Sequence, residues 1–341
     1  MEFITDTLHT LTQLDEEEYR RFHTQCGSPL FYDWRFLQAA ELSPLLSVKQ
    51  FFYLTVRLEG KLVAFIPAYL QRLDVVDPFH VLEQKADIRN DGDDYGLFSH
   101  IMHCFNSTVL SFSTLKNIYD SLFMRLKMTA EQVGARYSGL LNVADSPLLP
   151  LAAQADLNIN YMFDRYYADL THFRDFEHFL ESLPYDGRGE MRRQMRKFND
   201  SGAVASIVAP PFDQRLEQLT ELCFQTTARH GTPQYFPAAP LARFSRLCGD
   251  LIRLNIIEKD GELLAGMVCF EEQDTLHLWS AGMKYEGLAF SPYTLCFANA
   301  YQYAFQRRLK RLEAGRLNAK IKTRLGLQPL PLYAVTHHPH Q

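Results

Sequence analysis

One short pattern occurs twice in this chain, and it constrains the fold more than any other feature. Gly60 and Gly261 each follow an acidic residue, and each separates two apolar runs, within residues 51–70 and 254–270. An acidic residue followed by glycine between apolar runs predicts a β-hairpin, because glycine adopts positive φ without steric cost. In both copies a long helical segment and one more strand follow. The repeat therefore predicts two copies of one α+β unit, and we expect the chemistry in the second copy.

The length and composition fit this two-unit interpretation. A chain of 341 residues is long for one domain and comfortable for two, at roughly 100–200 residues each. We expect an α+β protein with domains at residues 1–164 and 165–341. The net charge of −5, from 35 basic and 40 acidic residues, excludes a protein that binds nucleic acid over its whole surface. Any nucleic-acid site has to be a local basic patch.

The start of the chain and its cysteines predict the compartment. Residues 1–6 have neither a basic region nor an apolar core, so no signal peptide is expected. No apolar stretch reaches the roughly 18–20 residues of a membrane-spanning helix. The six cysteines are scattered without a Cys-x-x-Cys pair, which predicts reduced thiols and a cytoplasmic location. Cys269 and Cys296 lie in apolar runs and are expected to be buried packing residues.

No motif indicates a metal or a nucleotide cofactor. The aspartate-rich segment 87–94 lacks EF-hand spacing and no glutamate closes it, so no metal site is predicted. The chain also has no Gly-x-Ser-x-Gly elbow, His-Glu-x-x-His pair, Walker loop or dinucleotide fingerprint. These absences argue against the hydrolases, zinc proteases, P-loop enzymes and dehydrogenases that those motifs mark.

The first candidate site is a loop followed by a helix in the second copy, at residues 284–308. Ser291 is placed to cap the helix, and Pro292 suits its first turn. Uncovered N–H groups at a helix start form a ready anion site, which would hold a pyrophosphate. The loop has one glycine, Gly287, so a plain β–α connection with a good cap is the simpler interpretation.

The second candidate is a basic helix over residues 188–200. Arg188, Arg192 and Arg196 are four residues apart and share one face. Residues 188–197 hold five basic side chains and one acidic side chain, a local charge of +4 in a chain of −5. Arginine suits phosphates and carboxylates because its planar fork donates in pairs. A solvated charged face is the alternative. The apolar stripe of this helix consists of Met191, Met195 and Phe198, and Arg193 and Lys197 extend the basic face.

The third candidate is a carboxylate at the end of a late strand. Glu313 precedes a glycine that leaves room for a ligand, and a partly buried carboxylate there could act as the general base for an amine. A structural pair with a nearby cation is the alternative. His230 and His277 are the best imidazole candidates, although a lone histidine is more often structural.

Three motifs occur in order within residues 165–335. They are Leu183, Arg188, Arg192 and Arg193 before Gly202; the run from Thr226 through His230 and Gly231 to Tyr235; and Glu313 and Gly315 followed by Lys322, Gly326 and Pro329. In this order they resemble the FemAB-like branch of the GNAT acyltransferase superfamily, especially bacterial proteins labelled peptidoglycan biosynthesis/recognition. The resemblance covers most of residues 165–335, and the first half is similar in pattern only.

The resemblance implies two tandem GNAT-like domains, the first degenerate, each with a mixed, mostly antiparallel sheet flanked by helices. It implies direct acyl transfer from a thioester to an amine or amino-acid acceptor, with acyl-CoA or acyl-carrier protein as co-substrate and no tightly bound cofactor. Two central strands would part to admit the pantetheine. The candidate catalytic residues remain Glu313 and His230, singled out above. The resemblance implies donor contacts for Ala281, Gly282 and Met283 at the pantetheine and for Lys284, Gly287 and Ser291 at its phosphates, with Tyr293 as a further donor contact. The implied phosphate or acceptor contacts are Arg188, Arg192, Arg193, Arg196 and Lys322.

One segment departs from the family pattern and keeps alternatives open. Residues 316–321 replace a small polar run of the family and are one residue longer, with Ile321 where the family has a histidine. Two alternatives therefore stand beside the thioester-dependent enzyme. One is a transferase that uses aminoacyl-tRNA, with the basic helix on RNA phosphates, and the other is a non-catalytic binding protein on the same scaffold.

Overall fold

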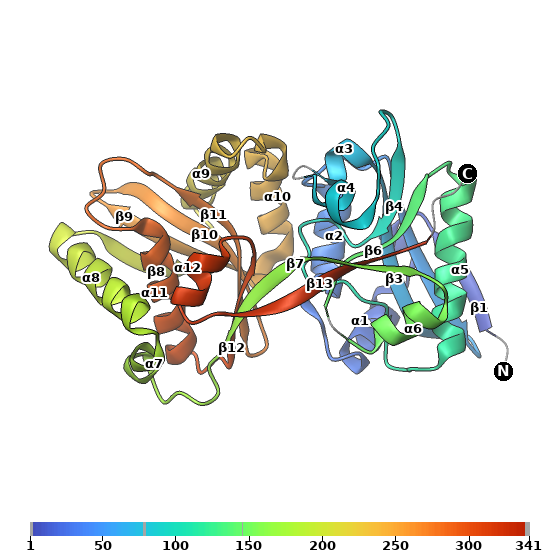
Figure 1. Ribbon diagram of the computed structural model, residues 1–341, viewed down its shortest axis with the longest axis horizontal. Helices are drawn as coiled ribbons and strands as arrows, with labels where there is room; N and C mark the ends of the chain where they lie inside the picture. The colour runs from blue at the N-terminus through green and yellow to red at the C-terminus, as the bar shows by residue number, and fades with distance from the viewer. Residues whose placement is uncertain (1–2, 78–79, 145, 338–341) are drawn as a thin grey trace. The chain divides into compact units, whose positions relative to one another are not determined.

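The structure is a computed structural model that describes residues 3–77, 80–144 and 146–337. The first two residues of the segment 1–6, where no signal peptide is expected, lie outside this part. Residues 338–341 of the predicted second domain lie outside it as well. The chain forms two compact units, one of Met1–Phe163 with Pro331–Gln341 and one of Asp164–Leu330. Each unit contains a mixed sheet flanked by helices, which confirms the predicted α+β class (Figure 1).

In the first unit the sheet order is β1-β2-β3-β4-β6-β13, and β5 pairs with β3. The β4–β6 pair is parallel, and the other pairs are antiparallel. The elements are β1 (Phe3–Leu8), α1 (Glu16–Gln25), α2 (Trp34–Leu42), β2 (Gln50–Leu58), β3 (Lys61–Arg72), α3 (Leu73–Val76), α4 (Val81–Ala86), β4 (Tyr95–Ser99), β5 (Leu110–Ser111), α5 (Lys116–Gln132), β6 (Tyr137–Ala144), α6 (Leu148–Gln154) and the end of β13 (Gln328–Thr336).

In the second unit the order is β7-β12-β11-β10-β9-β8, and only β11 and β12 are parallel. The elements are the end of β7 (Asn158–Asp169), α7 (Phe176–Ser182), α8 (Tyr185–Ser201), β8 (Val204–Val208), α9 (Arg215–Arg229), the short 3-10 helix η3 (Pro233–Tyr235), α10 (Ala238–Cys248), β9 (Ile252–Lys259), β10 (Glu262–Glu272), β11 (Thr275–Met283), α11 (Pro292–Gln306), β12 (Arg311–Arg316) and α12 (Ala319–Arg324).

Both predicted hairpins are present, with the same turn. Leu58 pairs with Lys61 and Lys259 pairs with Glu262, so each loop has two residues. Both loop residues adopt positive φ, at 51° and 79° in the first turn and 52° and 79° in the second. This is the type I′ geometry, whose twist matches that of the strands and whose second position favours glycine.

The end of the chain differs from the predicted boundary. Residues 332–336 of β13 pair with residues 139–144 of β6 in the first unit. The end of β7 pairs with β12 in the second unit. Residues 331–337 therefore belong to the first unit rather than to a domain of 165–341. The physical reason is that a late strand provides the hydrogen-bond partners for the open edge of β6, and sequence order does not reveal that pairing.

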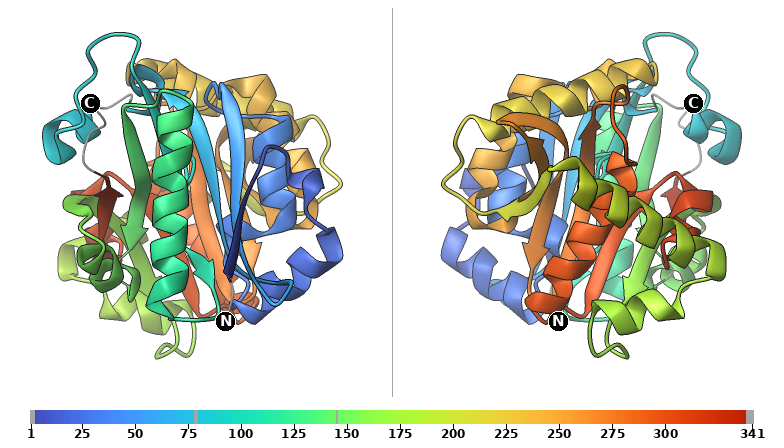
Figure 2. Two further views of the ribbon diagram at one scale, coloured as in Figure 1. Left: turned by 90° about the vertical axis from the view of Figure 1, so that its right-hand side faces the viewer. Right: turned by 90° about the vertical axis from the view of Figure 1, so that its left-hand side faces the viewer.

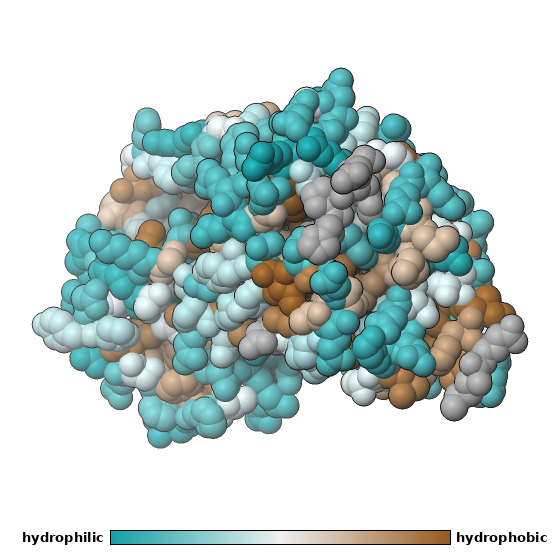
Figure 3. All heavy atoms as spheres, turned by 45° about the vertical axis from the view of Figure 1, so that its right-hand side comes forward, coloured by the Kyte–Doolittle hydropathy of each residue, from teal (hydrophilic) through white to brown (hydrophobic). Residues whose placement is uncertain are grey.

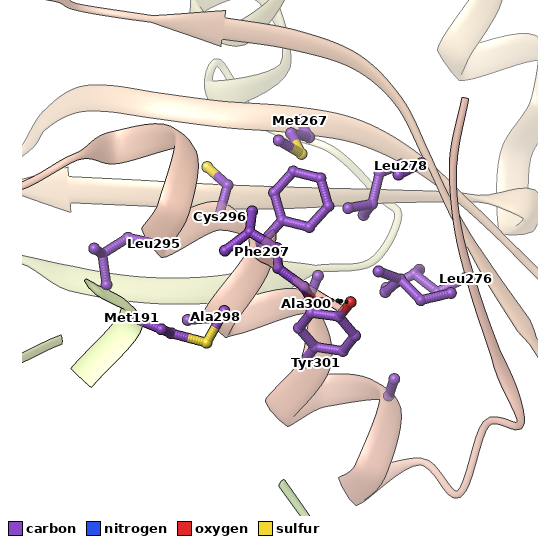
Figure 4. Close-up of a cluster of buried hydrophobic side chains, with 14 of the residues drawn as sticks. Met191, Met267, Leu276, Leu278, Leu295, Cys296, Phe297, Ala298, Ala300 and Tyr301 are labelled. Carbon is purple, nitrogen blue, oxygen red and sulfur yellow. Dashed lines mark hydrogen bonds between the residues drawn. The ribbon is translucent and has the colours of Figure 1, made fainter. Parts of the chain in front are cut away.

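The core of the second unit lies between its sheet and α11. Met267 on β10 and Leu278 on β11 face Phe297 and Tyr301 of α11, with Met191 of α8 alongside (Figure 4). On the opposite face of the sheet, Gly266 and Gly282 lie directly against side chains and backbone of α9. The predicted burial of Cys269 and Cys296 is confirmed.

The surface in view is largely hydrophilic, with smaller apolar areas between the polar side chains (Figure 3). Within the described residues, no helix combines the length and the apolar composition that crossing a bilayer requires.

Candidate functional site

The two parallel strands of the second unit part shortly after they meet. β11 and β12 pair at three positions, Thr275 with Arg311, Leu276 with Leu312, and His277 with Glu313. Beyond His277, β11 continues beside β10 and β12 continues beside β7. We call this divergence, between residues 278–283 of β11 and 314–316 of β12, the β11–β12 fork.

Irregularities in both strands explain the fork. Val268 of β10 pairs with Ser280 and Cys269 pairs with Leu278, so Trp279 is an extra residue in β11. β12 has its own register shift against β7 between residues 313 and 316, where Gly315 adopts a φ of 62°. A bulge bends its strand and increases the local twist. The strands therefore separate where each one bulges.

The ring of Trp279 fixes the bulge of β11. It stacks on Phe244 of α10 with a centroid distance of 5.5 Å, and Phe236 and Phe270 meet it edge-on at 5.3 and 5.0 Å. Aromatic pairs in these geometries contribute roughly 0.5–1.5 kcal/mol beyond their burial. The position of the bulge is therefore held by tertiary contacts.

Peptide groups of β11 face the fork. The N–H of Lys284 donates to the carbonyl of Leu264 on β10 at 2.9 Å. Peptide directions alternate along an antiparallel ladder, so Gly282 also faces β10, whereas Ala281 and Met283 face the fork. The N–H of Met283 donates to Oγ1 of Thr226 on α9 at 3.1 Å. The N–H and C=O of Ala281 face the fork, and no strand of the described residues pairs with them there.

The equivalent place in the first unit is filled by the chain itself. β4 and β6 pair in parallel from Gly96 with Tyr137 to Ser99 with Leu140. Residues 100–109 then lie along β6, since Nδ2 of Asn142 donates to the carbonyls of Met102 and Cys104. The side chains of residues 101–105 are buried. In the second unit, by contrast, no strand of the described residues pairs with residues 278–283 of β11 on the side of β12.

The predicted phosphate loop has few groups to offer an anion. Lys284 forms an ion pair with Glu262. The N–H of Ser291 donates to Oε1 of Gln194 on α8 at 2.7 Å, and Oγ of Ser291 accepts from the N–H of Thr294 at 3.3 Å. Pro292 has no N–H to donate. The N–H groups of Ser291 and Thr294 are therefore paired within the protein, and the pyrophosphate cradle over Lys284, Gly287 and Ser291 stays a prediction.

Gly287 and Tyr293 are placed differently from each other. Gly287 is exposed, with a φ of 76°. Burial raises the pKa of Tyr293 to about 12. The phenol oxygen of Tyr293 accepts a long hydrogen bond of 3.5 Å from Nδ2 of Asn318, directly after β12.

Lys322 serves the strand rather than a ligand. Its side chain is buried, and Nζ donates to the carbonyls of Ala314, Gly315 and Arg316 at 2.5, 3.2 and 2.6 Å. An ammonium has three N–H donors, so none remains for a phosphate or an acceptor. This corrects the predicted phosphate or acceptor contact. Burial and the nearby Arg316 lower the pKa of Lys322 to about 7.

Glu313 lies at the point where the strands part. It is 3% exposed, and Oε1 accepts from Nε of Arg311 at 2.7 Å and lies 3.7 Å from Nη2 of Arg165. Within the described residues, Oε2 is buried and accepts no hydrogen bond. Burial, together with Arg165 and Arg311, lowers the pKa of the neighbouring His277 to about 3, so that imidazole is neutral near pH 7.

The two predicted catalytic residues differ in their exposure. His230 directly follows α9 and has an exposed side chain, whereas Glu313 is buried. No hydrogen bond or ion pair joins His230 to Glu313 in the part of the chain that is described. Both stay predictions as catalytic residues.

The basic helix is present as α8, which runs beside α11 (Figure 2), and its apolar stripe packs in the core of the second unit. Nη1 of Arg188 donates to the carbonyl of Glu181, Arg192 lies 3.6 Å from Glu177, and Arg193 pairs with Glu190 at 2.5 Å. The side chains of Arg196 and Lys197 are exposed. Of the predicted residues, Arg188 is thus half-buried and the others are exposed, and ion pairs neutralise part of their charge.

Several residues at the fork had no sequence signal. Gln194 stands among arginines, and nothing in the sequence indicates that it caps a loop 97 residues away. Thr226 begins the motif that ends at Tyr235, so among these residues it is the one that the sequence could have indicated as part of the site. Arg316 donates to the hydroxyl of Tyr235 in η3, which fastens the end of β12. These contacts arise only from the tertiary fold.

Comparison with known proteins agrees with this geometry. A family model described as an acetyltransferase (GNAT) domain matches residues 186–323. The structure of FemX superposes with a TM-score of 0.63, at 10% identity over 97% of both chains. The chain has a GNAT-superfamily fold that is similar to the fold of FemX. The domain match over residues 186–323 indicates an acyltransferase.

Two other solved structures share the GNAT fold. L-PGS from Bacillus licheniformis has a TM-score of 0.58, at 11% identity over 96% of this chain and 93% of that one. A tandem GNAT protein from the clavulanic acid biosynthesis pathway has a TM-score of 0.56, at 10% identity over 98% of both chains. No curated protein matches the chain.

Proposed function

We propose that this GNAT-fold chain is an N-acyltransferase that takes its acyl group from a thioester bound in the β11–β12 fork. The observation that carries this proposal is the N–H and C=O of Ala281, which face the fork beyond the last strand pair. A pantetheine arm contains amide groups, so it can continue the ladder there in place of a strand. The thioester carbonyl then lies near the apex of the fork.

Transfer in this proposal is direct. The amine nitrogen of the acceptor attacks the thioester carbonyl, the C–S bond breaks, and the thiol leaves as a new amide forms. The amine has to lose a proton in this step, and a nearby base accelerates that loss. Glu313 is the base we propose, because it belongs to the last β11–β12 pair and its buried Oε2 accepts no bond within the described residues. Arg311 holds the other oxygen and so positions the carboxylate.

A second candidate function, transfer from aminoacyl-tRNA, is favoured by one observation. The exposed face of α8 carries Arg192, Arg193, Arg196 and Lys197 beside the loop that follows β11. A nucleic-acid donor would use such a face for its phosphates, and its binding would weaken steeply with salt. A non-catalytic protein would bind a donor and never turn it over.

A thermal-shift screen with acyl-pantetheine, acyl-CoA, free CoA and bulk tRNA tests the proposal. A ligand at about one hundred times its Kd stabilises the folded state by about 2.7 kcal/mol. We expect the thioesters to stabilise the protein. Absence of any shift with every thioester would refute the proposal.

The variant Ala281→Pro adds specificity to this screen. Proline removes the N–H that faces the fork without breaking the ladder to β10. We expect a wild-type-like unfolding profile without ligand and no shift with acyl-pantetheine. The control Ala281→Ser keeps the N–H and should keep the shift. Equal shifts in both variants would remove this peptide group from the donor site.

A further inference from the structure

The start of α11 is poorly equipped for the diphosphate of free CoA. The N–H of Ser291 is taken by Gln194, the N–H of Thr294 by the cap, and Pro292 contributes none, so Tyr293 supplies the one N–H of residues 291–294 that none of these contacts occupies. A helix start binds anions through such N–H groups and the helix dipole. The backbone that would hold a diphosphate next to the fork is therefore largely occupied, even though the peptide of Ala281 can still take a pantetheine arm.

The element that occupies these groups also presents cations next to the fork. Gln194 faces α11, and Phe198 meets Phe290 edge-on at 5.3 Å, so α8 lies against the loop between β11 and α11 (Figure 2). Arg193, Arg196 and Lys197 are on the outer side of the same turns and are exposed. Glu190 pairs with Arg193, which leaves Arg196 and Lys197 without an ion pair among the described residues. The positive charges of Arg196 and Lys197 thus lie on the same helical turns of α8 that contact the loop between β11 and α11.

The charge of this face contrasts with the charge of the chain. Residues 188–197 sum to +4 in a chain of −5. An acidic partner would be repelled by most of the molecule and attracted to this face, and complementary charge of this kind steers association and sets orientation. A face this small is short of the several phosphate contacts that an RNA needs, and the overall negative charge opposes RNA further.

We infer that the donor is delivered as a thioester on an acidic carrier protein, which docks on the exposed face of α8 and inserts its pantetheine arm into the β11–β12 fork. The inference rests on the proposed function. A carrier-bound arm has a phosphodiester in place of the diphosphate and 3′-phosphate of CoA. Its fit therefore requires no diphosphate cradle at the start of α11.

The experiment measures the affinity of a purified acidic acyl-carrier protein whose acyl arm carries a stable thioether. Fluorescence anisotropy at 50 and 300 mM NaCl compares it with acyl-pantetheine, acyl-CoA and bulk tRNA. The test variant is Arg196→Glu with Lys197→Glu. The matched control is Arg243→Glu on α10 with Lys259→Glu at the β9–β10 hairpin, which changes the net charge equally on other exposed positions.

We expect the test variant to weaken carrier binding at least tenfold more than it weakens acyl-pantetheine binding, and to abolish most of the salt dependence. The control should stay within twofold of wild type. Equal carrier affinity in test and control variants overturns the inference, as does acyl-CoA that binds as tightly as the carrier-bound thioether. Tight tRNA binding that the test variant removes would assign the face to a nucleic acid instead. Failure of every thioester to bind refutes the proposed function itself, and that outcome is distinct from the others.

Discussion

Replacing Lys322 by methionine tests the account of the fork most directly. Nζ of Lys322 accounts for the carbonyls of three successive residues, Ala314, Gly315 and Arg316. These are the groups of β12 that diverge from β11. Methionine retains a similar apolar stem and removes all three hydrogen bonds. We therefore expect the end of β12 to lose its anchor.

The cost can be estimated from the structure. A buried carbonyl left without a donor costs about 1–3 kcal/mol. Lys322 is 2% exposed, so water does not simply replace the ammonium at all three carbonyls. Removing a buried charge returns part of its desolvation penalty. We expect a net loss of about 2–4 kcal/mol in the free energy of unfolding.

Urea denaturation and hydrogen exchange of residues 311–318 measure this loss. The control Lys320→Met changes an exposed side chain on the same helix and should stay within about 0.5 kcal/mol of wild type. Faster exchange in residues 311–318 of Lys322→Met should accompany the loss. A loss below about 1 kcal/mol, or unchanged exchange there, would refute the role of Lys322 as the anchor of β12.

Three further predictions follow from the same contacts. The free energy of unfolding of wild type should rise relative to that of Lys322→Met between pH 7 and pH 9, by at most about 1.4 kcal/mol per pH unit. The reason is that Lys322 releases its proton in the folded state, where its pKa is lowered to about 7, but keeps it in the unfolded state, where its pKa is near 10.4. The slope is an upper bound because the carbonyl acceptors favour the protonated form. A difference that is flat in urea titrations over this range contradicts that assignment. Gly282→Ala should destabilise the protein by about 1–3 kcal/mol in urea, because its Cβ would lie 2.4 Å from the backbone nitrogen of Cys223, whereas Gly189→Ala meets nothing and should be neutral or stabilising; similar midpoints for both would exclude the close packing of β11 on α9. Glu313→Gln should lower the rate of thiol release in a screen of amine acceptors while donor-induced stabilisation persists, and an unchanged rate would exclude Glu313 as the base.

Local chemistry explains what the sequence predicted well. The turns at Gly60 and Gly261 are specified by residues that adopt positive φ, and both formed as expected. The stripe of Met191, Met195 and Phe198 follows helical spacing, and it packs on the core. These features depend on neighbours within a few residues. Patterns at that range are sufficient to predict hairpins, amphipathic helices and the α+β class.

The candidate site depended on contacts that no local pattern carries. In the sequence Trp279 looks like an ordinary strand residue. Its place as the bulge is apparent only from the strand register and from its ring contacts with Phe244 of α10 and Phe270 of β10. Lys322 matched a motif, yet its surroundings turn it toward carbonyls of β12. Gln194 has no motif at all. The sequence therefore predicted which segments form the site, and it misassigned what several side chains do there.

The two copies of the repeat differ mainly in the connection between the diverging strand and the next helix. Residues 284–291 connect β11 to α11, whereas residues 100–115 connect β4 to α5. The longer connection has enough chain to lie along β6 and bury residues 101–105. In the first copy, the chain itself therefore supplies hydrogen-bond partners for β6 beyond the end of the β4–β6 pairing. The shorter connection leaves the peptide of Ala281 facing the fork. One repeated hairpin thus leads to a filled copy that contributes structure and an open copy whose backbone can pair with a ligand, which is why we assign donor binding to the second unit alone.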